Sequence, residues 1–194
     1  MWSANWRREI LTLPNLLSLL RILLIPVYVS VYLGATRHRD YLLAGVILSV
    51  SCLTDLADGI IARRFHMTTN LGKLLDPLAD KLTQLALILS LSARYPGLYP
   101  VLGLFLVKET FQLGALVCFA RKGKALSGAL IPGKVCTTVL FVSLILPVLF
   151  PGLPEAAVNL LAATDTLFLL YAFLAYGAAY LGRGNRLEDL PGNG

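Results

Sequence analysis

Charged residues are scarce in this chain. Asp, Glu, Lys and Arg make up 14% of the 194 residues, whereas 57% are hydrophobic. A soluble domain carries about 25% charged residues, so the composition argues against a soluble globular protein. The length leaves room for one domain, and we expect a single all-α membrane domain over residues 1–194.

Cysteines are also few, and their spacing excludes a zinc site or a disulfide framework. Cys52, Cys118 and Cys136 lie within or beside apolar runs, where we expect buried small hydrophobic side chains. No small-residue cleavage site follows the first apolar run, so no cleavable signal peptide is expected. The net charge of +6 does not indicate a nucleic-acid partner, because the basic residues lie in short loops between apolar segments.

Six apolar segments, each near the roughly 20 residues that cross a bilayer, predict six transmembrane helices. They cover about residues 15–34, 42–63, 72–94, 101–121, 135–151 and 157–181. Residues 1–13 mix Trp, Ile and Leu with Arg, which predicts a short interfacial amphipathic helix. Residues 183–194 are expected to form a flexible tail.

The basic residues also predict the orientation. With six spans, one side of the membrane has Arg7, Arg8, Arg63, Arg64, Lys73, Arg121, Lys122, Lys124, Lys134, Arg183 and Arg186. The other side has Arg37, Arg39 and Arg94. The positive-inside rule therefore places both termini, and the turn between the second and third segments, in the cytoplasm. We expect a multi-pass protein of the cell membrane whose site faces the cytoplasm.

Four aspartates flank that turn. Asp55 and Asp58 lie three residues apart at the end of the second segment, and Asp76 and Asp80 lie four apart at the start of the third. Both spacings place a pair on one helix face. Carboxylates gathered at the edge of an apolar phase repel one another unless cations lie among them, which makes the cluster a candidate functional site.

Small residues share the two faces, since Gly59 and Ala62 follow Asp58 and Gly72 precedes Asp76. They would let a bulky ligand approach the backbone. Oxygen-only ligands favour Mg²⁺ or Mn²⁺ over zinc, and four carboxylates suit two ions. Two ions about 3.5–4 Å apart can clamp both oxygens of a phosphoryl displacement. Ion pairing of the aspartates with nearby Arg and Lys is the alternative.

Together these residues form the pattern Asp55-x2-Asp58-Gly59-x2-Ala62-Arg63-x8-Gly72-x3-Asp76-x3-Asp80. It resembles the motif of the CDP-alcohol phosphotransferase family at all eight fixed positions. The resemblance extends to a first-segment pattern, Asn15-x2-Ser18-x2-Arg21-x4-Pro26, in which the family more often has Thr where Ser18 stands. Members of this family displace CMP from a CDP-linked lipid with the hydroxyl of a second alcohol.

The resemblance implies roles for the motif residues. Two divalent cations, Mg²⁺ or Mn²⁺, would be held by Asp55, Asp58, Asp76 and Asp80. Asp80 would be a ligand or the general base that accepts the proton of the acceptor hydroxyl. The CDP moiety would contact Asp55, Gly59, Ala62, Arg63 and Gly72. The family also implies a homodimer among membrane lipids.

The acceptor alcohol is indicated by fewer residues. Residues 76–81, DPLADK, resemble the form found in phosphatidylglycerophosphate synthases and the related cardiolipin synthases. Lys81 would suit an acceptor phosphate, with snorkelling to headgroups as the alternative. Arg121 and Lys134 are further candidates for an acceptor or lipid phosphate, unless they are plain positive-inside charge. Arg21, if buried, needs an anion, which either a site aspartate or a substrate phosphate would provide.

The expected function is phosphatidyl transfer from CDP-diacylglycerol to glycerol 3-phosphate, with release of CMP. Transfer to phosphatidylglycerol, giving cardiolipin, or to another alcohol keeps the same chemistry. A divalent-cation transporter is the alternative of a different class, which the clustering of the aspartates at one membrane face disfavours.

Two further ionisable residues lie deep in the fourth and sixth segments. Lys108 and Asp165 are each about eight residues from the non-cytoplasmic end, so they could meet at one depth. We expect a structural pair there, or a cluster with Glu109.

Overall fold

The computed structural model describes residues 12–64, 69, 72–121 and 131–186. Their side chains are described apart from those of 56, 58–63, 73, 74, 116, 119–121 and 181–186. Regular structure in this part of the chain is entirely helical, which confirms the all-α prediction. The helices are α2 Leu13–Leu33, α3 His38–Arg64, α4 Gly72–Arg94, the short 3-10 helix η1 Pro96–Leu98, α5 Tyr99–Arg121, α6 Ile131–Leu149 and α7 Glu155–Arg186.

Each α-helix coincides with one predicted segment, although the ends differ by a few residues. The largest difference lies in α7, which continues to Arg186, so residues 183–186 are helical and not part of a tail. Gly182 and Gly184 lower helix propensity there, but the backbone stays helical through both glycines. The predicted interfacial helix falls on residues 1–11, which lie outside the described part.

Three of the described helices are long and apolar enough to cross a membrane: α2, α6 and the Glu155–Tyr180 part of α7. Helices α3 and α4, which carry the aspartates, are the least apolar of the described α-helices. The prediction of six spans is thus supported by composition for three helices.

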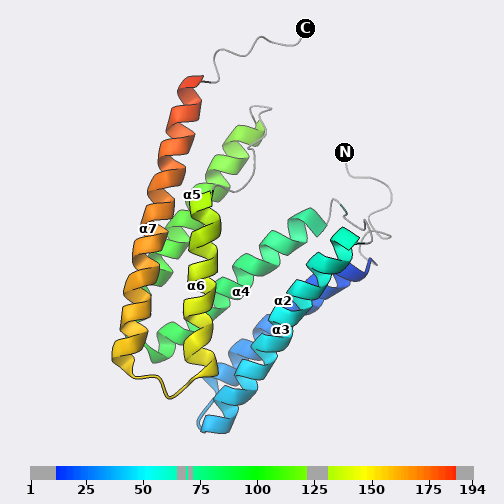
Figure 1. Cartoon of the computed structure of the whole chain (residues 1–194), viewed down its shortest axis with the longest axis vertical. Helices are drawn as coiled ribbons and strands as arrows, with labels where there is room; N and C mark the ends of the chain where they lie inside the picture. Colours follow the sequence, from blue (N-terminus) through cyan, green and yellow to red (C-terminus); the bar gives the residue numbers. More distant parts are fainter. Residues whose placement is uncertain (1–11, 65–68, 70–71, 122–130, 187–194) are drawn as a thin grey trace. The chain divides into compact units, whose positions relative to one another are not determined.

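The chain forms two compact units. The first comprises residues 1–94 and 145–153, and the second comprises residues 95–144 and 154–194. In the first unit α2 packs against both α3 and α4, and Figure 1 shows α2 (blue) running beside α3 (cyan). In the second unit α5 packs against α7.

One face of α2 forms much of the core of the first unit. After Pro14, its buried residues recur every three, four or seven positions: Asn15, Ser18, Arg21, Tyr28 and Tyr32. The face is therefore polar in its first half and aromatic in its second. Tyr28 Oη lies 3.1 Å from Ser90 Oγ of α4, so the aromatic half also makes a polar contact inside the core.

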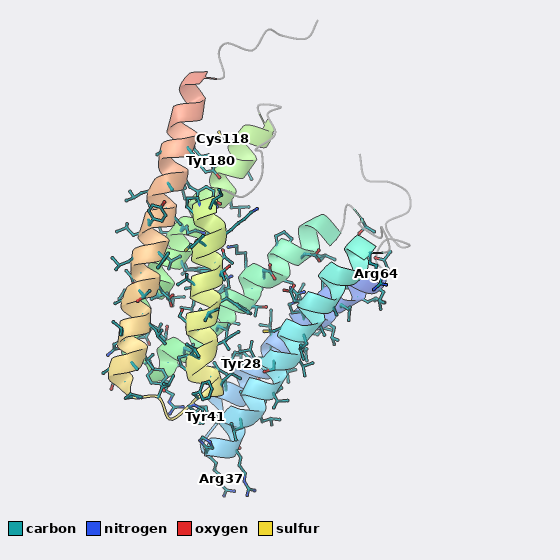
Figure 2. All side chains as sticks on the ribbon, in the orientation of Figure 1. Tyr28, Arg37, Tyr41, Arg64, Cys118 and Tyr180 are labelled. Carbon is teal, nitrogen blue, oxygen red and sulfur yellow. The ribbon has the colours of Figure 1, made fainter. Side chains whose placement is uncertain are left out.

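The end of the first unit farther from the aspartates is closed by Arg94. Its guanidinium lies 4.3 Å above the centre of the Tyr41 ring and donates a hydrogen bond to the carbonyl oxygen of Pro151 at 3.0 Å. Figure 2 shows Tyr41 and Arg64 at opposite ends of α3. Arg94 therefore has a structural use on the side where basic residues are few.

In the second unit the expected pairing of Lys108 with Asp165 is wrong. Lys108 Nζ contacts Glu109 Oε1 and Gln112 Oε1, both at 2.7 Å. Asp165, 1% exposed, instead meets the hydroxyl of Ser143 on α6, at 2.6 Å from Oδ1 and 2.5 Å from Oδ2. Equal depth does not make two residues neighbours, because the rotation of each helix about its axis decides which face meets which.

The cysteine prediction is confirmed in part. Cys136 is buried, Cys52 is half-buried, and Cys118 is exposed on α5, contrary to expectation. An apolar segment in a membrane protein can turn a small side chain outward, because the surrounding lipid is as apolar as the core.

The Ser143–Asp165 contact predicts a difference between two substitutions. Ser143→Ala removes the hydroxyl that meets the buried carboxyl and should lower the free energy of unfolding by about 1–3 kcal/mol. Asp165→Asn keeps a group that can bond to Ser143 and should be better tolerated. Thermal unfolding of the protein in detergent measures both.

The control is Ser30→Ala, which removes an exposed hydroxyl bonded to the Pro26 carbonyl oxygen and should change stability by less than about 0.5 kcal/mol. Equal losses for Ser143→Ala and Ser30→Ala would contradict the importance of the buried contact.

Candidate active site

The four aspartates lie on two helices near one end of the first unit. Asp55 and Asp58 lie in the last three turns of α3, and Asp76 and Asp80 lie in the first three turns of α4. Because both stretches are continuous helix, each pair shares a helix face, as predicted. Asp55 and Asp76 are half-buried and Asp80 is exposed, so these three carboxylates are open to a ligand.

A buried arginine of α2 joins the two aspartate-bearing helices. Arg21 is 2% exposed, its Nη1 donates to Asp80 Oδ1 at 2.8 Å, and its Nη2 pairs with Asp55 Oδ1. The anion that Arg21 was predicted to need is thus supplied by site aspartates. For Asp55 and Asp80 the ion-pair alternative is realised, and its cation comes from the first segment of the chain.

A second contact from α2 reaches the remaining described aspartate. The hydroxyl of Ser18, which is fully buried, donates to Asp76 Oδ1 at 2.6 Å. Ser18 and Arg21 are three residues apart and therefore share a face of α2. Their partners Asp76 and Asp80 are four apart on one face of α4, so two successive turns of α2 meet two successive turns of α4.

These contacts also give the relative direction of the two helices. The pairs Ser18–Asp76, Arg21–Asp80 and Tyr28–Ser90 advance together along both helices. Helices α2 and α4 therefore run parallel to each other where they pack.

The start of α4 is fixed against α2 by Asn15, Thr69 and Gly72. Asn15 Nδ2 donates to Thr69 Oγ1 at 2.9 Å, and the backbone N–H of Gly72 donates to the same oxygen at 2.9 Å. A hydroxyl in this position caps the free amides at a helix N-terminus. A Cβ on Gly72 would lie 2.6 Å from Asn15 Oδ1, so any larger residue here would have to displace the Asn15 carboxamide.

Of the other predicted site residues, the structure describes the side chains of Lys81 and Lys134. Lys81 is half-buried on α4, directly after Asp80. Lys134 is exposed in the first turn of α6, in the second unit. The side chains of the remaining predicted residues lie outside the described part: Asp58, Gly59, Ala62, Arg63 and Arg121.

Sequence reasoning gave no role to Asn15 and Ser18, although both belong to the first-segment pattern. The signal that could have identified them is the three-residue recurrence of Asn15, Ser18 and Arg21 within an otherwise apolar segment. Polar residues on one face of such a segment turn toward protein instead of lipid.

The chemistry of the aspartates suits a divalent cation. Asp55 and Asp80 both use Oδ1 to contact Arg21, and their side chains are 44% and 49% exposed. Carboxylate oxygens are the ligands that Mg²⁺ and Mn²⁺ prefer. Among the described side chains, no three of the types His, Cys, Asp and Glu are close enough together to hold a metal ion.

A comparison with protein families identifies this arrangement. The model for CDP-alcohol phosphatidyltransferases matches residues 11–178, which include the whole aspartate pattern and its α2 partners. The chain belongs to the CDP-alcohol phosphatidyltransferase family. The resemblance read from the motif is thereby confirmed.

Curated relatives include proteins named for two different enzyme activities. A CDP-diacylglycerol–glycerol-3-phosphate 3-phosphatidyltransferase of Pseudomonas fluorescens is 30% identical over 66% of this chain and 64% of its own length. A Mycobacterium bovis protein named "Putative cardiolipin synthase" is 32% identical over 90% of this chain and 82% of its own. A Drosophila melanogaster protein named "Probable cardiolipin synthase (CMP-forming)" is 37% identical over 56% of this chain and 33% of its own. The match thus covers only a third of the length of this last relative.

The close approach of Gly72 to Asn15 predicts a result for Gly72→Ala. The added methyl must displace the Asn15 carboxamide, so we expect a loss of about 1–3 kcal/mol in the free energy of unfolding. Asn15→Ala in the same chain removes the obstacle, so the double variant should lose less than the sum of the single losses. Thermal unfolding of the four proteins gives this coupling.

The matched control is Gly103→Ala, since a Cβ on that helical glycine meets nothing within 4 Å. Gly103→Ala should leave stability unchanged or raise it. Additive losses for Gly72→Ala and Asn15→Ala would contradict the packing role of Gly72.

Proposed function

We propose that the protein transfers a phosphatidyl group from CDP-diacylglycerol to the hydroxyl of glycerol 3-phosphate, releasing CMP. The product is phosphatidylglycerophosphate, and the reaction is a step in phospholipid biosynthesis. The observation that carries the proposal is that the chain belongs to the phosphatidyltransferase family and that α2 holds three aspartates of the motif through Ser18 and Arg21.

The aspartates would hold two divalent cations, Mg²⁺ or Mn²⁺, that neutralise the charge on the pyrophosphate and the departing CMP. We assign Asp80 a role as metal ligand or as the general base that accepts the proton of the attacking hydroxyl, as the family resemblance implies. Its exposed carboxylate is compatible with both roles. Asp55, Gly59, Ala62, Arg63 and Gly72 would shape the CDP site. The packing of Gly72 against Asn15 supports an indirect contribution of this glycine, through the placement of α4.

We further propose six membrane spans, with both termini and the aspartates on the cytoplasmic side of the cell membrane. The parallel packing of α2 and α4 supports this arrangement, because the first and third spans of an alternating chain run in the same direction. Each of α3, α4 and α5 has at least 23 residues, enough for a bilayer at about 1.5 Å per residue.

Exposed apolar side chains support membrane contact for α3 as well. Leu42, Val46, Val50 and Leu53 are 45–63% exposed and recur every three or four residues. Such a stripe on a helix surface is suited to lipid. It ends two residues before Asp55, where the polar region begins.

The choice of glycerol 3-phosphate as the acceptor is based on Lys81. Its charge directly follows Asp80 in α4 and would suit the phosphate of glycerol 3-phosphate. Arg121 and Lys134 are further phosphate ligands in this proposal. Arg21 is not one of them, because its guanidinium already pairs with Asp55 and Asp80. Phosphatidylglycerol is the second candidate acceptor, because the Mycobacterium bovis relative that matches 90% of this chain is named for cardiolipin synthesis. A homodimer follows from the family resemblance alone.

A panel of acceptors tests the assignment. Purified protein receives CDP-diacylglycerol and Mg²⁺ or Mn²⁺ with glycerol 3-phosphate, phosphatidylglycerol, serine or inositol phosphate in turn. We expect CMP release and a new lipid with glycerol 3-phosphate. Cardiolipin formation from phosphatidylglycerol alone would transfer the assignment to the second candidate. Absence of CMP release with every acceptor would contradict the enzyme proposal.

Asp80→Asn tests the proposed proton acceptor. A carboxamide cannot take the proton, so we expect CMP release to fall by about 10²–10⁴-fold. The protein should stay folded, as judged by its elution in detergent and its helical circular dichroism. Near-normal turnover would exclude the base role of Asp80.

Asp40→Asn is the matched control. Asp40 lies in the first turn of α3 and accepts hydrogen bonds from the backbone N–H groups of Thr36 and Arg37, at 3.0 and 2.9 Å. Turnover of this variant should equal that of the unmodified protein. A comparable loss in both variants would indicate a general effect of removing acidic charge.

A further inference from the structure

The ion pairs of Arg21 are unevenly buried. The arginine side chain is 2% exposed, whereas those of Asp55 and Asp80 are 44% and 49% exposed. The positive charge is therefore enclosed by the helices, and the negative charges face a region that a ligand can reach. A metal ion arriving at the carboxylates meets them with a cation already bound on the inner side.

Arg21 cannot leave this position cheaply. It lies within α2, between Ser18 and Tyr28 on the buried face, and a guanidinium that loses its anions inside an apolar core is strongly destabilised. The two carboxylates likewise need a positive charge, because like charges this close repel one another. Arg21 supplies that charge when no ligand is bound.

We propose that Arg21 is the internal counter-charge of the site and that it competes electrostatically with the divalent cation for Asp55 and Asp80. The inference rests on the proposed function insofar as that function places cations on these aspartates. Arg21 is a positioning residue here: it holds α2, α3 and α4 together without metal, and it weakens the binding of a metal ion on its own.

The competition has a thermodynamic consequence. Two cations that neutralise the same carboxylates are negatively coupled, so removal of one increases the contribution of the other to the stability of the fold. Without Arg21 the fold should depend on the metal ion, which then supplies the missing positive charge. With Arg21 present, the same metal should add little to stability.

The test uses Arg21→Gln in the full chain in detergent, with Mn²⁺ as the probe. In EDTA the variant should unfold roughly 5–10 °C below the unmodified protein. Saturating Mn²⁺ should raise its Tm by several degrees more than it raises that of the unmodified protein. Mn²⁺ titration followed by electron paramagnetic resonance should show a Kd about tenfold lower in the variant.

The matched control is Arg94→Gln, which removes a cation of the same unit at the end away from the aspartates. Its Tm should fall in EDTA, and the shift on adding Mn²⁺ should equal that of the unmodified protein. Arg21→Lys retains the charge but lacks the two-pronged geometry, so its Mn²⁺ shift should lie between those of the unmodified protein and Arg21→Gln. If Arg21→Gln is not recovered folded, the Mn²⁺ shift of Arg21→Lys relative to the unmodified protein tests the proposal.

An Mn²⁺ shift in the Arg21 variants equal to or smaller than that of the unmodified protein would overturn the proposal. So would weaker Mn²⁺ binding after substitution, since the arginine would then assist the metal. CMP release by the unmodified protein, measured on the same preparation, keeps this result separate from the proposed function. If the unmodified protein forms product but the Arg21 variants show the same Mn²⁺ shift as the unmodified protein, the role of Arg21 is overturned and the proposed function stands.

Discussion

The buried guanidinium of Arg21 holds the first unit together, because its two anions come from α3 and α4 while it belongs to α2. Three helices thereby share one charge cluster. The Ser18–Asp76 contact and the Asn15–Thr69 contact extend the same face of α2 toward the start of α4. The geometry of the aspartates is consequently a property of α2 as much as of the two helices that carry them.

The sequence predicted the helices and the aspartate pattern well, because both depend on local information. Apolar segment length predicted the six α-helices of the described residues, and the spacing of Asp76 and Asp80 predicted their shared face without knowledge of any partner. The family followed from the same eight positions. Helix ends were less accurate, as the continuation of α7 through Gly184 to Arg186 illustrates.

Contacts between helices could not be predicted in the same way. Lys108 and Asp165 lie at similar expected depths, yet Lys108 meets Gln112 of its own helix and Asp165 meets Ser143. The rotation and tilt of each helix decide such partners, and both arise from packing over the whole surface. Arg21 illustrates the same limit. The sequence predicted that a buried Arg21 needs an anion, but only the packing of the helices shows that site aspartates supply it.

The exposed apolar stripe of α3 ends at Leu53, and Asp55 begins the polar region within one helical turn. In the proposed function, a donor lipid would keep its acyl chains in the bilayer while its headgroup reaches the carboxylates. Encounter between such a donor and the protein would take place by lateral diffusion in two dimensions. The quantity that governs donor supply is then the mole fraction of the lipid in the membrane, and dilution with inert lipid slows the encounter even when the bulk concentration is constant.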